Sequence, residues 1–280
     1  MDRGSSTQFA SRLARGQTVV VEGAGRELVQ NAASAGRALM LLSDVLGSLG
    51  HVPRALPSVL KQVAMSGFGS LFVLALIAGL TGMIMAVQTG AALEPFGATS
   101  QLGGIIAVTF CRELGPIWAA VIVLARVGAA IAAELGTMVV NEEVDALRCM
   151  SVDPVRYLVL PRFVGLIIAM PLLAALADAV GMAGGALVAT TMFNQPLETY
   201  LDSARQFLVP LDFYSGLFKA AVFGAIIAII ACARGLGTRD GAEGVGRATT
   251  SSVVLNVIFV LLADLILTWA VQVIVKPVLG

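Results

Sequence analysis

The chain has 280 residues, of which 58% are hydrophobic and 13% charged, and its mean hydropathy is +0.89. This composition excludes an ordinary soluble domain and favours an integral membrane protein. The formal net charge is zero, which gives no sign of a nucleic-acid partner. Three widely separated cysteines favour neither a disulfide framework nor a zinc site.

The N-terminal part divides into two segments. Residues 1–25 are polar and are expected to be flexible, whereas residues 26–66 contain apolar residues at helical spacing. This pattern predicts an amphipathic helix that lies in the membrane interface, and a helix packed on a partner protein is the alternative. Pro53 and Pro57 are expected to break the chain before it enters the membrane.

Residues 67–280 are predicted to form one all-α membrane domain with five transmembrane helices. A helix needs about 20 mostly apolar residues to cross the hydrocarbon core of a bilayer. Five stretches meet or nearly meet this requirement, and the sequence places them at 67–87, 102–133, 163–193, 213–233 and 253–275.

The basic residues predict the orientation of these helices. Lys and Arg are retained on the cytoplasmic side of bacterial membranes. They precede the first span and lie in the second-to-third and fourth-to-fifth connections, whereas the other connections carry few. The prediction is a multi-pass protein of the bacterial inner membrane, with a cytoplasmic N-terminus and a periplasmic C-terminus.

The second span contains Arg112 and Glu113, followed by Gly115 and Pro116. Charges at membrane depth are costly, and they usually face a bundle interior or a watery cavity. The residues alone leave two interpretations of Arg112 and Glu113 open. They are either a polar patch in a substrate cavity or a structural ion pair between helices.

Arg126 lies almost four helical turns after Arg112 and also needs a partner. Asp178 in the third span and Asp264 in the fifth are the available buried acids, so we expect intramembrane ion pairs among these residues. A proton relay through the acids is the alternative.

The connection between the second and third spans predicts a short cytoplasmic helix over about 141–151. Asn141 is expected to cap it, with Glu142, Glu143 and Asp145 in its first turn. Val144 and Leu147 would share an apolar face. Such a helix suits the docking of another protein, and a solvated connector is the alternative.

The sequence shows no pattern for catalysis. The glycine-rich loop at 235–250 lacks the order of a phosphate-binding loop, so any ATP hydrolysis belongs to a partner chain. We find no set of catalytic residues or metal ligands and expect no cofactor bound by this chain. Five spans cannot form two equal inverted repeats, and small residues spaced four apart favour close helix contacts, so we expect a homodimer.

Several ordered motifs are similar to those of one known family. The chain resembles the MlaE/YrbE permease family from about Gly67 to its C-terminus, and the motifs are Arg112–Pro116, Ala125–Met138, Glu142–Leu147, Val152–Pro154, Leu160–Arg162 and Gly246–Thr250.

The resemblance implies a homodimeric permease subunit in an ATP-driven transporter of lipids, with glycerophospholipid as the expected cargo. It also implies a cytoplasmic ABC ATPase docked on the 141–151 helix and a periplasmic ring of MCE-domain proteins. Arg112 and Glu113 would line a lipid cavity between the two protomers. The competing hypotheses are an ion-coupled transporter or proton channel that uses Glu113, Asp178 and Asp264, and an assembly scaffold.

Overall fold

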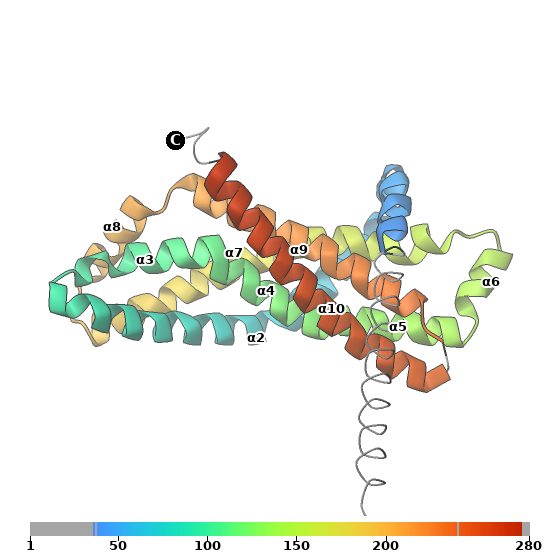
Figure 1. The fold of residues 1–280 in the computed structure, drawn as a ribbon, viewed down its shortest axis with the longest axis horizontal. Coiled ribbons are helices and arrows are strands. Elements are labelled where there is room, and N and C mark those ends of the chain that lie inside the picture. The colour runs from blue at the N-terminus through green and yellow to red at the C-terminus, as the bar shows by residue number, and fades with distance from the viewer. Residues whose placement is uncertain (1–35, 37, 240, 276–280) are drawn as a thin grey trace, which may run out of the picture.

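The computed structural model describes residues 36, 38–239 and 241–275, which form an all-helical bundle (Figure 1). Five of the described helices are long and apolar enough to cross a membrane: Ala55–Phe96, Thr99–Val140, Val155–Thr191, Pro210–Leu236 and Gly241–Val273. The prediction of five membrane-spanning helices is therefore confirmed, although several extend well beyond the expected bounds. The reason is that helical packing continues past the apolar window that hydropathy detects.

The first span is α2 (Val52–Leu93), continued by η2 (Glu94–Phe96). It follows a shorter apolar helix at Ala38–His51, whose last turn is the 3₁₀ segment η1 (Leu49–His51) and which runs across the long axis of the bundle in Figure 1. The expectation that Pro57 interrupts the chain is wrong, because α2 continues through it. Pro57 lies in the second helical turn, where few backbone hydrogen bonds depend on it. Residues 1–35, including the rest of the expected interfacial helix, lie outside the described residues.

The second span is one long helix with two π-helical segments. After η3 (Thr99–Gln101) it runs through five segments, which are α3 (Leu102–Thr109), η4 (Phe110–Leu114), α4 (Gly115–Val123), η5 (Leu124–Gly128) and α5 (Ala129–Val140). Each π segment inserts an extra residue into a turn, and such bulges are frequent at functional sites. Arg112 and Glu113 lie in η4, and Arg126 lies in η5.

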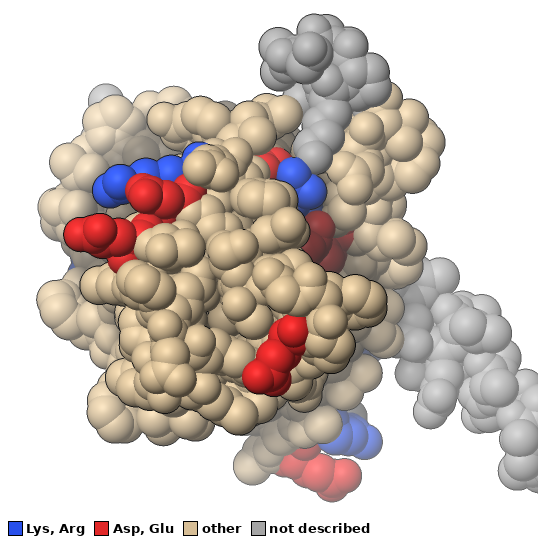
Figure 2. Space-filling view, turned by 90° about the vertical axis from the view of Figure 1, so that its left-hand side faces the viewer, with Lys and Arg blue, Asp and Glu red and all other residues tan. Residues whose placement is uncertain are grey.

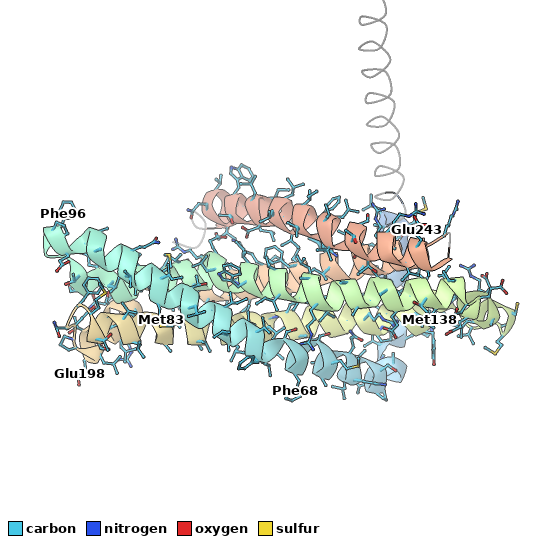
Figure 3. The ribbon with its side chains drawn as sticks, turned by 90° about the horizontal axis from the view of Figure 1, so that it is seen from below. Phe68, Met83, Phe96, Met138, Glu198 and Glu243 are labelled. Carbon is cyan, nitrogen blue, oxygen red and sulfur yellow. The ribbon has the colours of Figure 1, made fainter. Side chains whose placement is uncertain are left out.

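The remaining elements complete the bundle. They are α6 (Glu143–Cys149), η6 (Val155–Val159), α7 (Leu160–Thr191), α8 (Leu197–Phe207), α9 (Pro210–Leu236), α10 (Gly241–Ala270) and η7 (Val271–Val275). Figure 1 places α6 and α8 at opposite ends of the long axis, and we call these the α6 end and the α8 end. Glu198 and Glu243 mark the same two ends in Figure 3.

The centre of the bundle is α7, which packs on α2 along one side and on α9 along another. The approach of α2 to α7 depends on glycine, because a Cβ on Gly82 would overlap the carbonyl oxygen of Gly181. In the same way, a Cβ on Gly184 would overlap the backbone of Gly79. These small residues are therefore used within one chain, so they give no separate support for a homodimer.

The outer surface of the bundle is apolar along its length. Phe68 is 80% exposed on α2, and α10 has most of its large apolar side chains exposed. Figure 3 shows Phe68 and Phe96 projecting from the outside of α2 and η2. Lipid tails would cover such a surface, since a membrane protein needs no polar coat at this depth.

Candidate functional site

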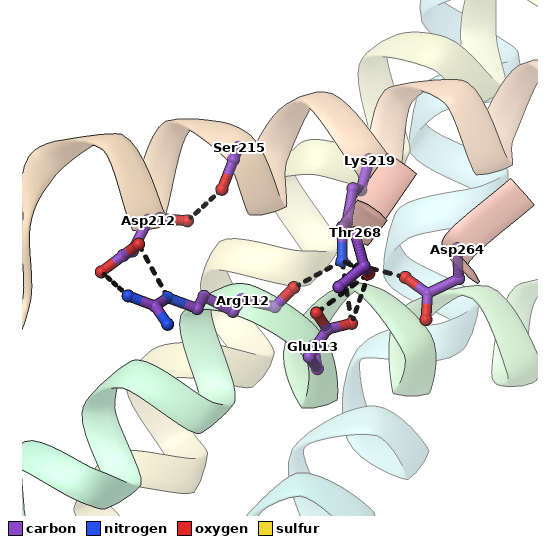
Figure 4. A network of polar contacts seen from close by, with 7 residues as sticks. All are labelled: Arg112, Glu113, Asp212, Ser215, Lys219, Asp264 and Thr268. Atoms are coloured by element: carbon purple, nitrogen blue, oxygen red, sulfur yellow. Dashed lines mark hydrogen bonds and ion pairs between the residues drawn. The ribbon is translucent and has the colours of Figure 1, made fainter. Parts of the chain in front are cut away.

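Three spans bring charged side chains together inside the bundle (Figure 4). The second span contributes Arg112 and Glu113, α9 contributes Asp212 and Lys219, and α10 contributes Asp264. We call these five residues, with Thr268 of α10, the polar network. It lies nearer the α8 end than the α6 end, as the positions of its members along their helices require.

Lys219 is the centre of the polar network. Its ammonium donates to Glu113 Oε2 at 2.8 Å, to Asp264 Oδ1 at 3.1 Å and to Thr268 Oγ1 at 2.7 Å. The Thr268 hydroxyl in turn lies 3.1 Å from Glu113 Oε1 and donates to it. Lys219 is almost fully buried, with 3% of its side chain exposed. A buried ammonium is tolerable here because every proton has an acceptor.

The backbone supplies a further acceptor for Lys219. Its ammonium lies 3.1 Å from the carbonyl oxygen of Arg112. In a helix this carbonyl would accept from the N–H of residue 116, but Pro116 has no N–H to donate. Proline at this position therefore frees the carbonyl that Lys219 contacts, which links the local sequence to the site.

Arg112 is held by Asp212 of α9. Nη2 donates to Oδ2 at 2.9 Å, and Nε forms an ion pair with Oδ1 at 2.7 Å. Asp212 is buried, with 1% of its side chain exposed, whereas 31% of the Arg112 side chain is exposed. Glu113 is also 31% exposed. The polar network thus presents one edge of a guanidinium and one carboxylate outward from an otherwise buried set.

Asp212 and Lys219 received no role from the sequence, although they hold the two residues that did. They lie seven residues apart on α9, which is two turns, and so share one face of that helix. Two opposite charges at this spacing were a signal that could have pointed to partners for Arg112 and Glu113.

The structure does not form the expected ion pairs of Arg126. Asp264 contacts Lys219 instead, and Asp178 is buried with its Oδ1 atom lacking a hydrogen-bond partner among the described residues. A Cβ on Gly115 would overlap this Oδ1 atom, so Asp178 faces α4. Arg126 lies on an exposed surface of the chain beside Gly69 of α2. Both acids lie at the level of Glu113 and Gly115, about 17–20 Å along the second span from Arg126.

The short helix α6 is present, but Asn141 does not cap it. Asn141 ends α5 by donating its backbone N–H to Thr137 O at 2.9 Å, and α6 starts after Glu142, whose φ is 60°. Val144 is buried within the chain, and Leu147 packs against the core. The apolar face of α6 is therefore turned inward. Glu142, just before α6, and Glu143 and Asp145 within it are exposed.

An ion pair connects α5 and α7, the helices that precede and follow α6 in the chain. Nη2 of Arg162, near the start of α7, lies 2.9 Å from Glu134 Oε1 on α5. Nη1 of Arg162 donates to the Leu158 carbonyl in η6 at 2.6 Å. Arg162 is buried, so this contact fixes the spacing of the two helices beside the connection.

Among the described residues, no three His, Cys, Asp or Glu side chains lie close enough together to hold a metal ion. The arrangement is a set of charged groups inside an apolar bundle, with a separate short helix at one end. Such an arrangement suits a membrane permease.

Comparison with known sequences decides the class. The sequence model of the family described as Permease MlaE matches residues 59–270. The chain belongs to the MlaE permease family. This confirms the resemblance seen in the motifs.

Sequences of known proteins align with most of the permease. It is 40% identical over 244 residues to a probable ABC transporter permease protein of Rickettsia bellii, covering 87% of this chain and 94% of that one. It is 39% identical over 212 residues to a probable ABC transporter permease protein of Synechocystis, covering 76% and 81%.

A plant relative is the protein named TRIGALACTOSYLDIACYLGLYCEROL 1, chloroplastic, of Arabidopsis thaliana. The permease is 38% identical to it over 211 residues, which cover 75% of this chain and 60% of the plant protein. The permease is thus a multi-pass, non-catalytic subunit of an ABC transporter, a class in which a separate subunit hydrolyses ATP.

Proposed function

We propose that this permease moves lipids, with glycerophospholipids as the cargo, in an ATP-driven complex with a separate ATPase and an MCE-domain protein. The observation that carries the proposal is the polar network, which exposes Arg112 and Glu113 from an apolar bundle. A phospholipid has both an anionic headgroup and apolar chains, so it matches both features. The name of the plant relative, which contains a galactolipid, supports lipid as the class of cargo.

Arg112 would contact the headgroup through its free edge. Asp212 occupies Nε and Nη2, which leaves Nη1 without a hydrogen bond among the described residues. Guanidinium groups suit phosphate geometry. Asp212 would keep Arg112 in place when no lipid is bound, so the charge is never left alone in the apolar layer.

The charges at the two ends support an orientation. The α6 end has Arg148, Arg156 and Arg247 in or beside its connections, whereas α8 has Arg205. Figure 2 looks onto the α8 end, where uncharged residues form most of the surface. The α6 end would therefore be cytoplasmic, with the MCE-domain ring over the α8 end, in a bacterial inner membrane.

The ATPase would dock on the exposed side of α6. Glu142, Glu143 and Asp145 offer an acidic edge, and Met150, which is 65% exposed, offers an apolar contact beside it. Val144 and Leu147 would hold α6 to the bundle, because they face inward. ATP-driven closure of the ATPase would then move α6 and the spans attached to it.

Two copies of the permease would enclose the lipid site. The exposed edges of Arg112 and Glu113 require a neighbour in the apolar layer, and a second copy would complete a cavity around them. An odd number of spans also favours a pathway shared between copies.

Native mass spectrometry of the purified complex tests this assembly. We expect two permease copies, the ATPase and bound phospholipid, with less ATPase in Glu143→Lys/Met150→Asp. Glu198→Lys, which changes a carboxylate at the α8 end, is the control for a new positive charge. An active complex with one permease copy would exclude the shared cavity. Full ATPase recovery with the double variant would exclude docking on α6.

A further inference from the structure

Arg126 is a membrane-depth arginine that the polar network does not use. It lies in η5, and its side chain is exposed on the surface of the chain. No acid of the described chain forms an ion pair with it, whereas Arg112 and Arg162 each have one. A cation at this depth is costly unless an anion or water reaches it.

The Arg126 guanidinium packs against Gly69 of α2. A Cβ on Gly69 would lie 2.5 Å from Nη1 and 2.6 Å from Cζ. The guanidinium therefore lies directly against the backbone of α2, and only glycine leaves this space. Met65 and Phe72 lie on the same face of α2 as Gly69, one turn before and one turn after it. Met65 is 62% exposed and Phe72 is 79% exposed.

The Arg126 guanidinium lies within the leaflet at the α6 end. Lys61 precedes Gly69 by eight residues, and Glu134 follows Arg126 by eight residues, both toward the α6 end. Eight helical residues span about 12 Å. Arg126 thus lies about 12 Å inside these two charged residues, where its charge needs an anion or water to reach it.

The described spans of a second copy have no free carboxylate to offer at this depth. In the described spans, Lys219 binds Glu113 and Asp264, and Arg162 binds Glu134. Asp212 is bound by Arg112, and Asp178 is buried. The membrane itself then supplies the remaining anion, which is the phosphate of a lipid.

We propose that Arg126 and Gly69 form a second lipid site, which binds the phosphate of a phospholipid in the leaflet at the α6 end. The acyl chains of this lipid lie along the exposed face of α2 formed by Met65, Phe68, Phe72 and Leu76. The site is about 20 Å from Arg112 along the same helix, so it is distinct from the polar network. Lipid reaches the transport pathway of the proposed function from this site.

Binding to the full-length permease in detergent tests the site without ATP or partners. Phosphatidylglycerol is the probe, and native mass spectrometry measures its retention. Arg126→Gln is expected to weaken the tightest binding step about tenfold, as loss of one charge-assisted phosphate contact would. Arg205→Gln, which removes an exposed arginine of α8, is expected to leave it unchanged.

Gly69→Ala separates geometry from charge. The added methyl group displaces the guanidinium but keeps its charge, and alanine favours a helix over glycine, so the fold is retained. We expect weaker phosphatidylglycerol binding with an unchanged or higher unfolding temperature. Excess inorganic phosphate should not displace the lipid, because it cannot use the face of α2.

Equal phosphatidylglycerol binding by the folded wild type and Arg126→Gln would overturn the site. Separation of the two copies by Arg126→Gln, with lipid binding unchanged, would assign Arg126 to a contact between chains instead. Displacement by inorganic phosphate would show an anion site without lipid selectivity. Failure of ATP-driven transfer with intact binding would count against the proposed function alone.

Discussion

At the scale of single residues, Lys219 determines whether the polar network is stable. It joins a carboxylate of the second span to a carboxylate of α10 and contacts the backbone beside Pro116. Glu113 and Asp264 would otherwise be two like charges in an apolar layer. The network therefore works as a unit, and the removal of one member affects the others.

Arg112→Ala is expected to destabilise the permease, because it strands the buried Asp212 carboxylate. Breaking a buried pair typically costs about 3–5 kcal/mol, and the partial exposure of Arg112 places this case near the lower limit. Arg112→Gln/Asp212→Asn removes both charges and should recover most of the lost stability. Thermal unfolding in detergent measures both effects.

The double variant also separates the two roles of Arg112. If Arg112 contacts lipid phosphate, Arg112→Gln/Asp212→Asn will be stable but slow in lipid transfer. Normal lipid transfer per folded complex by the double variant would show that the Arg112–Asp212 pair is structural only. Arg112 would then not be a lipid-binding residue.

Lys219→Met is expected to lower the unfolding temperature more than Arg112→Ala, because it leaves two carboxylates without a cation. Adding Glu113→Gln should restore part of the loss, since one of the two charges is removed. Thermal unfolding of the single and double variants checks this. An additive or larger loss in the double variant would show that Lys219 and Glu113 are not coupled.

The sequence singled out three of the six members of the polar network: Arg112, Glu113 and Asp264. Arg112 and Glu113 were recognisable because charges are rare in apolar spans. Their partners were not, because pairing depends on how three helices rotate against one another, and hydropathy carries no such information. The expectation for Arg126 failed because Asp178 and Asp264 lie at the level of Gly115 and Glu113, about 17–20 Å along the second span from Arg126.

At the scale of elements, glycine sets the contact between α2 and α7. Gly82→Ala is expected to destabilise the permease by about 1–3 kcal/mol, because the new methyl group meets the Gly181 backbone, which cannot move aside alone. Gly67→Ala, on the same helix but in open space, should be neutral or slightly stabilising. Thermal unfolding compares the two variants. Equal stability would mean that the helices separate without cost.

The contact between Glu134 and Arg162 is expected to couple α6 to the bundle. Glu134→Gln should leave the ATPase bound and active, but lower the lipid moved per ATP roughly fivefold, which corresponds to about 1 kcal/mol of coupling. ATP hydrolysis and lipid transfer are measured together, with Glu198→Gln as the control at the α8 end. Unchanged lipid transfer per ATP would remove this ion pair from the coupling path.

The existence of the elements was easier to predict than their ends. Five apolar stretches identified five spans, because each span must bury its backbone in helical hydrogen bonds. Hydropathy missed the extensions of α2 and α5 beyond the apolar layer. It also missed the π segments, because one extra residue in a turn leaves the composition unchanged.

At the scale of the whole molecule, the two ends differ in charge and in attached elements. The α6 end has a short exposed acidic helix, and the α8 end has an amphipathic helix held on α3 by Ser203, whose hydroxyl accepts from the Gly104 N–H at 3.0 Å. Burial raises the pKa of the Tyr200 phenol, which donates to the Met182 carbonyl and so stays protonated. Membership of the MlaE permease family and the polar network between these ends together support a transport role.

Lipid transfer by the complete complex in proteoliposomes tests the central claim most directly. The complex of permease, ATPase and MCE-domain protein is given fluorescent phospholipid, with either ATP or a proton gradient as the energy source. We predict transfer that requires ATP, is abolished by a catalytically inactive ATPase and is unaffected by collapse of the proton gradient. Transfer driven by the proton gradient without ATP would contradict the account, as would an active, intact ATPase complex that moves no lipid.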